Sequence, residues 1–264
     1  MRIFGRPARR YLASVPHIPE YVQSAARCIR LFQNPWTVLR CYLTRSTPPG
    51  HVLRLRQGMT IHLSEDPFDI VTVFGLFVRQ DYGLIAPGSK VVDIGANIGV
   101  FTLFAIHCGA SVVHAYEPSG DSFQCLRRNL DENRLNGKVS SFRSAVSKGP
   151  ERVVPFPRRS SVYNALGSGT QSGDGFDEVP LETLATVIER IGHADLLKMD
   201  CEGEEEQIID GAGLDVMQLV DEIRLEYHNG RGAVIKQLLA DRGFKPTFWW
   251  EADARGGLGW FERL

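Results

Sequence analysis

The chain has 264 residues, of which 43% are hydrophobic, 9% aromatic and 23% charged, and its formal net charge is −1. These proportions are ordinary for a globular protein and exclude the fibrous and intrinsically disordered classes. No run of about 18 apolar residues occurs, so we expect no transmembrane segment. The near-zero net charge argues against a surface that is basic throughout, and we therefore expect no nucleic-acid partner.

The charge is distributed unevenly along the chain. Residues 1–60 contain ten arginines and one acidic residue, Glu20, which gives this segment +9 and the rest of the chain −10. A basic segment ahead of an acidic body is typical of an arm, of a cap over an anionic ligand, or of a region attracted to an anionic surface. It is equally typical of a solvated pair of helices that happens to use arginine.

The basic segment is expected to form a helical appendage. Apolar residues at near-helical spacing predict one or two helices over 18–45, and Pro35 starts or kinks the second. Thr-Pro-Pro-Gly at 47–50 is a strong chain break. We therefore place a domain boundary there, between an appendage at 1–50 and a second domain at 51–264.

The second domain begins with a hairpin predicted over 51–63 and a helix over 68–79, and from residue 89 strands and helices alternate. Strands are predicted at 90–94, 111–117, 139–143, 177–180, 194–200 and 222–227, helices at 99–108, 119–136, 181–191, 204–210 and 232–242, a long loop at 157–177, and an antiparallel pair at 244–249 and 258–261. This alternation predicts an α/β fold whose mostly parallel sheet is covered on both faces.

The five cysteines indicate a reducing compartment. Their number is odd, and no two are spaced as Cys-x-x-Cys. The N-terminal twenty residues are basic but lack the continuous apolar stretch of a secretory signal. We therefore expect the protein in the cytoplasm, with its cysteines acting as small hydrophobic residues.

A glycine-rich turn follows the first strand of the alternating region, in the sequence V-V-D-I-G-A-N-I-G at 91–99. Gly95 and Gly99 allow a tight turn and the approach of a ligand to a helix start, and Asn97 stands between them. The third glycine of a dinucleotide fingerprint is missing. Asp93, at the strand end, is expected to repel a pyrophosphate and to attract a cation or an ammonium group.

A second acidic residue ends the next strand. Glu117 lies in A-Y-E-P, twenty-two residues after Gly95, where a carboxylate can bind both hydroxyls of a ribose. An acid for an ammonium group and an acid for a ribose together match S-adenosylmethionine. We expect Pro118 beside this site, and Ser144 and Ala145, after the third strand, to flank the adenine. The alternative is a helix-capping Asp93 and a surface glutamate of an unrelated α/β protein.

Four separated motifs resemble the FkbM family of S-adenosylmethionine-dependent methyltransferases. They are D-I-G-A-N-I-G-V-F-T at 93–102, A-Y-E-P-S at 115–119, L-L-K-M-D-C-E-G-E-E at 196–205 and R-L-E-Y-H at 224–228. The stretch 69–83 looks like the leading helix of the same family, and the resemblance covers roughly residues 50–250. It implies the seven-stranded, Rossmann-like class I methyltransferase fold, with an antiparallel C-terminal pair in a mostly parallel sheet.

The resemblance also implies transfer of a methyl group to a hydroxyl of a sugar, a polyketide or a related natural product. Residues 1–50 lie outside it, and we expect the appendage to serve assembly, as a homo-oligomer, or acceptor access. The chain departs from the family where three glutamates, 204–206, follow Gly203 in place of a small residue. We interpret these glutamates as the acidic first turn of a helix.

The catalytic candidates are Asp200, Glu202, Glu226 and His228, at the ends of the fourth and fifth strands. An alcohol is a poor nucleophile until its proton is removed, so a base or a metal ion is needed. His228 is the leading candidate base, with Asp200 and Glu202 positioning the acceptor or the cofactor. The rival is Mg²⁺ held by Asp200, Glu202 and Glu226. Each of them can instead be an ordinary strand-end residue.

Two other functions remain open at this point. The first is an NAD-linked oxidoreductase on a Rossmann sheet, against which the missing third glycine and the lack of a Tyr-x-x-x-Lys pair both argue. The second is a non-catalytic relative that binds S-adenosylmethionine but has lost the chemistry.

Overall fold

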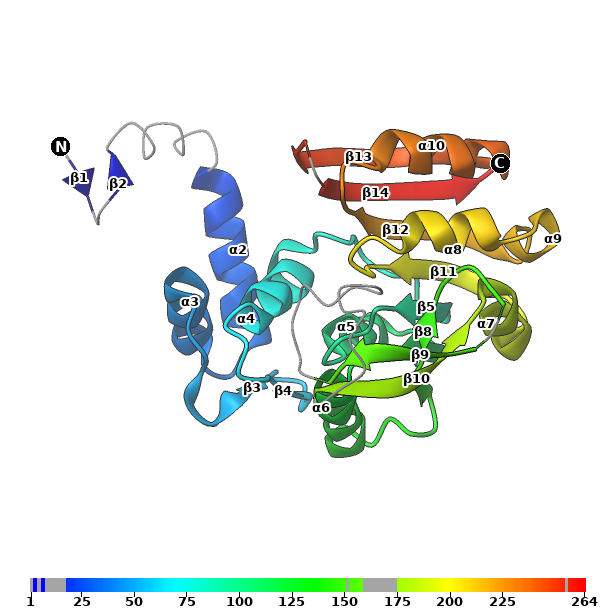
Figure 1. The fold of residues 1–264 in the computed structure, drawn as a ribbon. Helices are drawn as coiled ribbons and strands as arrows, with labels where there is room; N and C mark the ends of the chain where they lie inside the picture. The colour runs from blue at the N-terminus through cyan, green and yellow to red at the C-terminus, as the bar shows by residue number, and fades with distance from the viewer. Residues whose placement is uncertain (1, 4–5, 8–17, 151, 159–174, 255) are drawn as a thin grey trace.

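A seven-stranded sheet forms the centre of the protein (Figure 1). The computed structural model of the chain describes residues 2–3, 6–7, 18–150, 152–158, 175–254 and 256–264. The strand order is β13-β14-β12-β11-β5-β6-β7. The strands are β5 (Lys90–Ile94), β6 (Val112–Tyr116), β7 (Val139–Phe142), β11 (Ala194–Met199), β12 (Val220–Tyr227), β13 (Phe244–Asp253) and β14 (Gly256–Arg263).

The register of the strands confirms the predicted sheet. The strands from β12 to β7 are parallel to one another, and β14 runs antiparallel to both of its neighbours, β12 and β13. This mostly parallel, Rossmann-like sheet with its antiparallel strand near the C-terminal edge is the class I methyltransferase arrangement expected from the sequence. The fold places the carboxyl ends of β5, β6, β11 and β12 at one edge, where open α/β sheets bind ligands.

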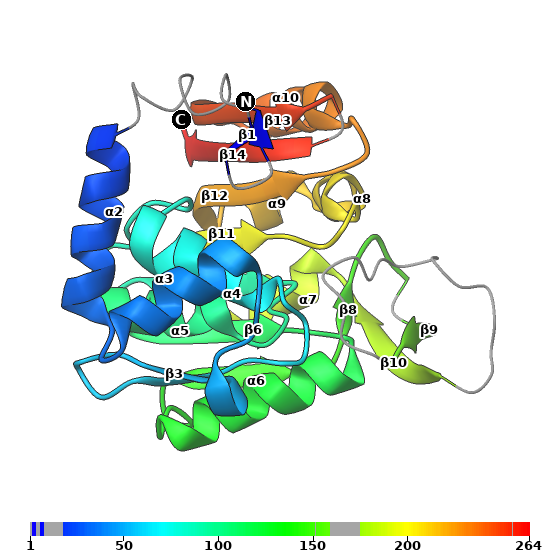
Figure 2. The ribbon, with the colours of Figure 1, turned by 90° about the vertical axis from the view of Figure 1, so that its left-hand side faces the viewer.

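Helices cover both faces of the sheet. Figure 2 shows α2 to α5 on one side and α7 and α8 on the other. The helices are α2 (Ile18–Leu31), α3 (Pro35–Thr44), η2 (Pro49–His51), α4 (Asp69–Val73), the π-helical η3 (Phe74–Arg79), α5 (Val100–Cys108), α6 (Gly120–Glu132), α7 (Leu184–Ile191), α8 (Glu205–Gly211), α9 (Leu214–Met217) and α10 (Gly232–Asp241). Among the described residues, no helix combines the length and the apolarity needed to cross a bilayer.

Alternation along the strands divides the core into two layers. In β5, Val91 packs with the cluster under α5 and α6, whereas Val92 packs with the cluster under α7 and α8. Leu196 and Leu197 of β11 divide in the same way. Because side chains alternate across a strand, Asp93 and Lys198 point to the α5 side of the sheet.

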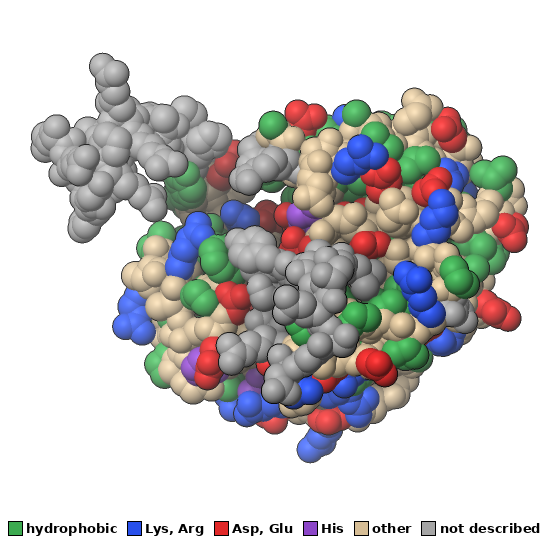
Figure 3. All heavy atoms as spheres, in the orientation of Figure 1, with side chains coloured by type: hydrophobic (Ala, Val, Ile, Leu, Met, Phe, Trp, Pro, Cys, Tyr) green, Lys and Arg blue, Asp and Glu red, His purple; other side chains and the backbone are tan. Residues whose placement is uncertain are grey.

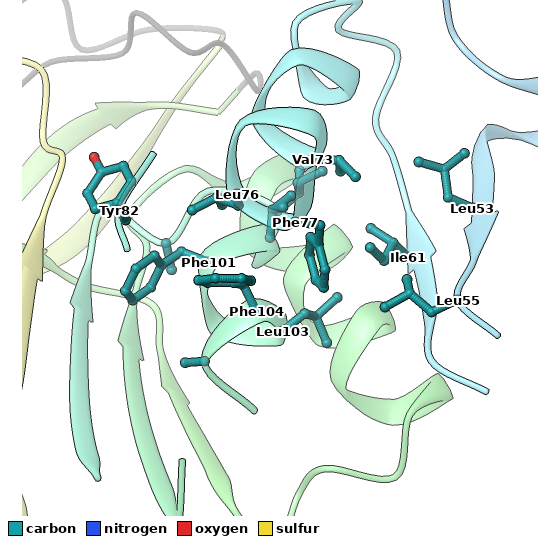
Figure 4. Packing of buried hydrophobic residues seen from close by; sticks show 14 of the residues in the cluster. Leu53, Leu55, Ile61, Val73, Leu76, Phe77, Tyr82, Phe101, Leu103 and Phe104 are labelled. Atoms are coloured by element: carbon teal, nitrogen blue, oxygen red, sulfur yellow. The ribbon is translucent and has the colours of Figure 1, made fainter. Parts of the chain in front are cut away.

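The helices α2 and α3 pack into the main core. Phe32, at the end of α2, is completely buried and makes an edge-to-face contact with Phe77 of η3, with ring centroids 6.4 Å apart. Figure 4 shows Phe77 among Leu55, Ile61 and Phe104. The sequence boundary at residue 50 therefore separates residues that share one hydrophobic cluster.

Within the described ranges, the smaller strands form three further sheets. The predicted hairpin consists of β3 (Val52–Arg54) and β4 (Thr60–His62), and the three-stranded sheet has the order β8-β10-β9. The remaining strands are β1 (Arg2–Ile3), β2 (Arg6–Pro7), β8 (Ala145–Val146), β9 (Arg152–Pro157) and β10 (Phe176–Glu182). The sequence analysis did not predict β9, and 159–174 of the expected loop lie outside the described residues.

The single helix predicted over 68–79 is α4 followed by the π-helical turn η3. In a segment this short, the spacing of hydrophobic residues does not distinguish a π-helical turn from an α-helix. The sequence pattern therefore indicated one continuous helix. The widened turn brings Leu76 and Arg79 to the wall of the cavity described below.

The shared core predicts that loss of the Phe32 ring destabilises the whole domain. Phe32→Ala is expected to lower the free energy of unfolding by roughly 3–5 kcal/mol, as measured by denaturant titration. Leu43→Ala, at an exposed position of α3, is the control and should change it by less than about 0.5 kcal/mol. A separate early transition in Phe32→Ala, with the main transition unchanged, would show that the N-terminal helices fold as an independent unit.

Candidate active site

A cavity of about 710 Å³ opens at the carboxyl edge of the sheet. Its floor is the glycine turn after β5 and the ends of β6, β11 and β12, and its opposite wall comes from α4 and η3. The site residues predicted from the sequence that line it are Gly95, Asn97, Glu117, Pro118, Ser144, Ala145, Asp200, Glu202, Glu226 and His228. The structure therefore brings together residues from five separated segments of the chain.

The two glycines of the turn are required by contacts within the protein. Gly95 has φ +74°, and a Cβ there would lie 1.8 Å from the carbonyl oxygen of Asp200. Gly99 has φ +87°, and a Cβ there would lie 2.5 Å from a methyl group of Leu126. The sequence analysis attributed the two glycines to the approach of a ligand. The structure adds a second reason, because a side chain at either position would collide with protein atoms.

Asp93 lies beneath the cavity rather than in its wall. Its carboxylate is fully buried, accepts a hydrogen bond from Thr102 Oγ1 at 2.7 Å, and is 3.0 Å from Lys198 Nζ. Lys198 Nζ also donates to the carbonyl oxygen of Gly95 at 2.7 Å. The predicted direct contact of Asp93 with an ammonium group does not fit this placement, because Lys198 is already its cationic partner.

The argument that Asp93 repels a pyrophosphate fails for the same reason. Burial disfavours the charged form of Lys198, but the carboxylates of Asp93 and Asp200 outweigh it and raise the pKa of Lys198. The ammonium group therefore stays charged and neutralises Asp93. Asp93 supports the glycine turn through Lys198.

Glu117 lines the cavity at the end of β6, as predicted. Its two carboxylate oxygens accept hydrogen bonds from the backbone N–H groups of Asn97, at 2.8 Å, and Ser119, at 2.7 Å. Burial raises the pKa of Glu117 to about 7, although these two N–H groups favour the charged form. A carboxylate has about four acceptor positions, so two remain for a ligand.

Ser144 offers an unused hydroxyl to the cavity. Its Oγ is buried, lines the cavity beside Ala145, and has no hydrogen-bond partner among the described residues. A buried hydroxyl without a partner is costly, so a polar ligand atom at this place would stabilise it. The position fits the predicted adenine end of a cofactor.

His228 is surrounded by carboxylates at the end of β12. Its Nδ1 is 3.3 Å from an oxygen of Glu205, and its Nε2 is 3.6 Å from an oxygen of Glu202 and 3.9 Å from one of Glu226. A ligand atom of Asp200 also lies within 4.8 Å of those of Glu202 and His228. The group that converges within this distance contains His228 and not Glu226, and the alternative magnesium set of Asp200, Glu202 and Glu226 stays a prediction.

This arrangement makes the imidazole basic and the acids weak. Burial disfavours the charged form of His228, but Glu205, Asp200 and Glu202 outweigh it and raise its pKa to about 9. Burial, reinforced by Asp200, raises the pKa of Glu202 to about 7 and also raises the pKa of Glu226. At neutral pH the imidazolium itself is the cation of this cluster.

The three consecutive glutamates have three different partners. Glu205 is buried, faces His228, and accepts the backbone N–H of Cys201 at 2.8 Å. Glu204 accepts a hydrogen bond from Ser147 Oγ at 2.6 Å, and Glu206 forms an ion pair with Arg231. The predicted acidic first turn of a helix is confirmed, since Glu205 and Glu206 lie in the first turn of α8 and Glu204 is its N-cap residue. Glu205 in addition orients the imidazole.

Tyr82 is a site residue that the sequence analysis missed. Its hydroxyl is buried without a partner among the described residues, and its side chain lines the cavity. Figure 4 shows the ring beside Phe101 with the hydroxyl pointing away from the hydrophobic cluster. Burial and the nearby carboxylates hold its pKa well above the usual value, so it stays a neutral donor. The Asp-Tyr-Gly sequence after the leading helix was the available signal.

Comparison with known proteins identifies the family of this chain. The model of the methyltransferase FkbM domain matches residues 93–246, more than half of the chain. The chain belongs to the FkbM methyltransferase family. This assignment supports S-adenosylmethionine as its cofactor and replaces the oxidoreductase alternative.

Two curated methyltransferases match this chain over most of their own length. The 31-O-demethyl-FK506 methyltransferase FkbM of Streptomyces tacrolimicus is 29% identical, over 73% of this chain and 88% of that protein. Methyltransferase 1 of Beauveria bassiana is 25% identical, over 64% of this chain and 78% of that protein. Among solved structures, a ribosomal protein L11 methylase of Lactobacillus delbrueckii has a TM-score of 0.46 and 13% identity, covering 82% of this chain and 83% of its own.

The buried ion pair predicts a strong and asymmetric effect of substitution in this FkbM-family chain. Lys198→Met leaves the Asp93 carboxylate buried without its cation and is expected to lower the free energy of unfolding by about 3–5 kcal/mol. Adding Asp93→Asn to that variant should recover much of the loss, because no buried charge then remains. Lys148→Met, which breaks an exposed pair with Asp210, is the control and should have little effect. Equal stability of the Lys198 and Lys148 variants would contradict this role.

Proposed function

We propose that this FkbM-family protein is an S-adenosylmethionine-dependent O-methyltransferase that acts on a hydroxyl of a sugar, a polyketide or a related natural product. The observation that carries the proposal is the imidazole of His228, which lines the cavity and is oriented by the buried Glu205. A histidine held in this way can remove a hydroxyl proton. The name of the Streptomyces relative, which specifies an oxygen as the methylated atom, also supports it.

The cavity residues fit the cofactor. Glu117 has free acceptor positions for ribose hydroxyls, and the Ser144 hydroxyl has no partner in the described part of the chain. Asn97, Pro118 and Ala145 complete this end of the cavity. When bound, S-adenosylmethionine supplies a methyl group on a positively charged sulfur. Gly95 and Gly99 set the backbone conformation of the turn beneath these side chains.

His228 is proposed as the general base. Its Nε2, which faces Glu202 and Glu226, would take the proton of the acceptor hydroxyl, while Glu205 holds Nδ1. A second positive charge in the cavity opposes the imidazolium and lowers the pKa of His228 from about 9 toward neutrality. Asp200 and Glu202 are proposed to position the acceptor or the cofactor.

The acceptor is proposed to be a small molecule without negative charge. The acids Asp200, Glu202 and Glu226 line the cavity, and their ionised forms repel phosphate and carboxylate groups, which argues against nucleic acid as the partner. Apolar side chains of Leu76 and Leu258 complete the wall and suit a bulky scaffold that carries a hydroxyl.

The proposed compartment is the cytoplasm, because all five cysteines are free and burial raises the pKa of the Cys28 thiol to about 11.

The N-terminal helices are proposed to assist acceptor access. Tyr42 of α3 stacks on Phe74, with ring centroids 3.8 Å apart, and its hydroxyl accepts a hydrogen bond from Arg79 in the cavity wall at 3.3 Å.

Two measurements test the proposal as a whole. Calorimetry should detect binding of S-adenosylmethionine and S-adenosylhomocysteine but not of NAD or NADP. Methyl transfer to a panel of hydroxylated acceptors should then produce methyl ethers. Cofactor binding with no transfer to any oxygen, nitrogen or carbon acceptor would favour the non-catalytic relative instead.

Glu117 gives a specific prediction for cofactor affinity. Glu117→Ala removes a charge-assisted contact to the ribose and should weaken binding by about 2 kcal/mol, roughly thirtyfold. The measurement is calorimetry with S-adenosylhomocysteine, and Glu132→Ala, on the exposed side of α6, is the control. A folded Glu117→Ala variant with unchanged affinity would remove the ribose assignment.

His228 gives a prediction for pH dependence. The pKa of His228 is raised in the folded protein, so its neutral, basic form accumulates only as pH rises toward 9. We expect kcat/KM, which reports on the free enzyme, to increase through that range and His228→Ala to lose about a hundredfold or more.

Chelation separates the histidine base from a metal ion. Activity should survive EDTA if the imidazole is the base, since the imidazolium already occupies the carboxylate cluster. Activity that EDTA abolishes and Mg²⁺ restores, together with a nearly normal His228→Ala variant, would overturn the base assignment.

A further inference from the structure

The outer face of α3 carries large apolar side chains into solvent. Trp36 is 73% exposed and Leu43 is 76% exposed, and both lie on the same side of the helix as Arg40, at i, i+4 and i+7. The opposite side of α3, with Val38 and Cys41, is buried in the main core. The helix is thus apolar on its inner side, as expected, and also on its outer side.

The neighbouring helix α2 has the same character. Tyr21, Val22 and Ile29 are exposed on it, and α2 contacts α3. Of the twelve exposed large hydrophobic residues in the described part of the chain, five lie between residues 21 and 43. Figure 2 shows α3 facing the viewer with α2 beside it. Such a concentration marks an interaction surface rather than scattered exposure.

Uncompensated positive charge accompanies these side chains. Residues 18–60 contain six arginines and one acid, Glu20. Arg30 and Arg40 are exposed, and within the described residues neither forms an ion pair. In Figure 3, basic and hydrophobic side chains occur together over the region where Figure 1 places α2 and α3.

We propose that the outer face of α2 and α3, which we call the N-terminal face and define by Val22, Ile29, Arg30, Trp36, Arg40 and Leu43, docks on the surface of an anionic lipid bilayer. Tryptophan and leucine insert at the boundary between head groups and acyl chains. Arginines beside them bind the anionic head groups. The face thus has both components that a peripheral membrane helix needs.

A second copy of the chain fits this face less well. In a two-fold symmetric contact the same face meets itself, so a face defined by two arginines and no acid would meet a second face of the same positive charge. Glu20 is the sole acid among residues 18–60, and it cannot balance the six arginines of each copy. An anionic surface supplies the missing negative charge.

The position of the face relates it to the cavity. Tyr42 of α3 contacts Phe74 and Arg79 of η3, and η3 lines the cavity. A chain docked in this way would hold the cavity wall close to the bilayer. The docking itself does not depend on the proposed methyl transfer, and it can be tested on the full chain without any acceptor.

The test is co-sedimentation of the full chain with two kinds of vesicle, phosphatidylcholine alone and phosphatidylcholine mixed with phosphatidylglycerol. The wild-type chain should sediment with the mixed vesicles and remain in solution with phosphatidylcholine alone, and added salt should release it. Trp36→Ala combined with Leu43→Ala should reduce partitioning about tenfold or more. Arg30→Gln and Arg40→Gln should each reduce it about fivefold.

Matched controls separate this face from general exposure and charge. Leu214→Ala removes a leucine that is 61% exposed on α9, and Arg127→Gln removes an exposed arginine from α6. Both should sediment like the wild type. All variants are first checked for an unchanged unfolding transition.

Three results would overturn the proposal. The first is no sedimentation with the mixed vesicles at low salt, and the second is equal sedimentation with both kinds of vesicle. The third is a dimer in solution that Trp36→Ala converts to a monomer, which would assign the face to a second copy, the homo-oligomer expected from the sequence.

Discussion

The buried ion pair between Asp93 and Lys198 is the interaction on which the site depends. The two residues are partners in the register of β5 and β11, so the sheet itself sets their separation. Lys198 also donates to the carbonyl oxygen of Gly95, which ties the pair to the turn above it. A buried pair of this kind contributes little net stability compared with apolar residues, but a single unpaired charge there is strongly destabilising. The pair therefore holds the glycine turn after β5 in one position.

A second electrostatic group lies at the ends of β11 and β12, next to the first, and Asp200 interacts with both. The imidazole of His228 is the positive centre of a cluster whose acids come from the loop after β11, the start of α8 and the end of β12. The cluster contains more acidic groups than one imidazolium can neutralise. Burial raises the pKa of Glu202 and of Glu226, so these acids carry less negative charge than exposed carboxylates would. The excess makes this end of the cavity receptive to a positively charged ligand.

Sequence reasoning succeeded where function follows from position along one strand. Glu117 directly follows β6 and His228 directly follows β12, and the alternation of strands and helices together with local motifs was enough to place both at the same edge. It failed where the answer depends on contacts between segments. The partner of Asp93 depends on the pairing of β5 with β11, and nothing in three consecutive glutamates distinguishes the buried Glu205 from its neighbours. The burial of Phe32 in the main core likewise depends on a contact across 45 residues of sequence.

The close approach of the Asp200 carbonyl to Gly95 has a consequence for how such sequences evolve. This chain needs glycine at position 95 to keep its backbone arrangement, whether or not a ligand is bound. A descendant that lost its chemistry would retain the motif, so searching genomes by the glycine turn collects a fold and not an activity. After a loss of function, we expect substitutions to accumulate first at Ser144 and Tyr82, because no described residue forms a hydrogen bond with their hydroxyls. We therefore expect those two positions to change earlier than Gly95 in a descendant that no longer binds a ligand.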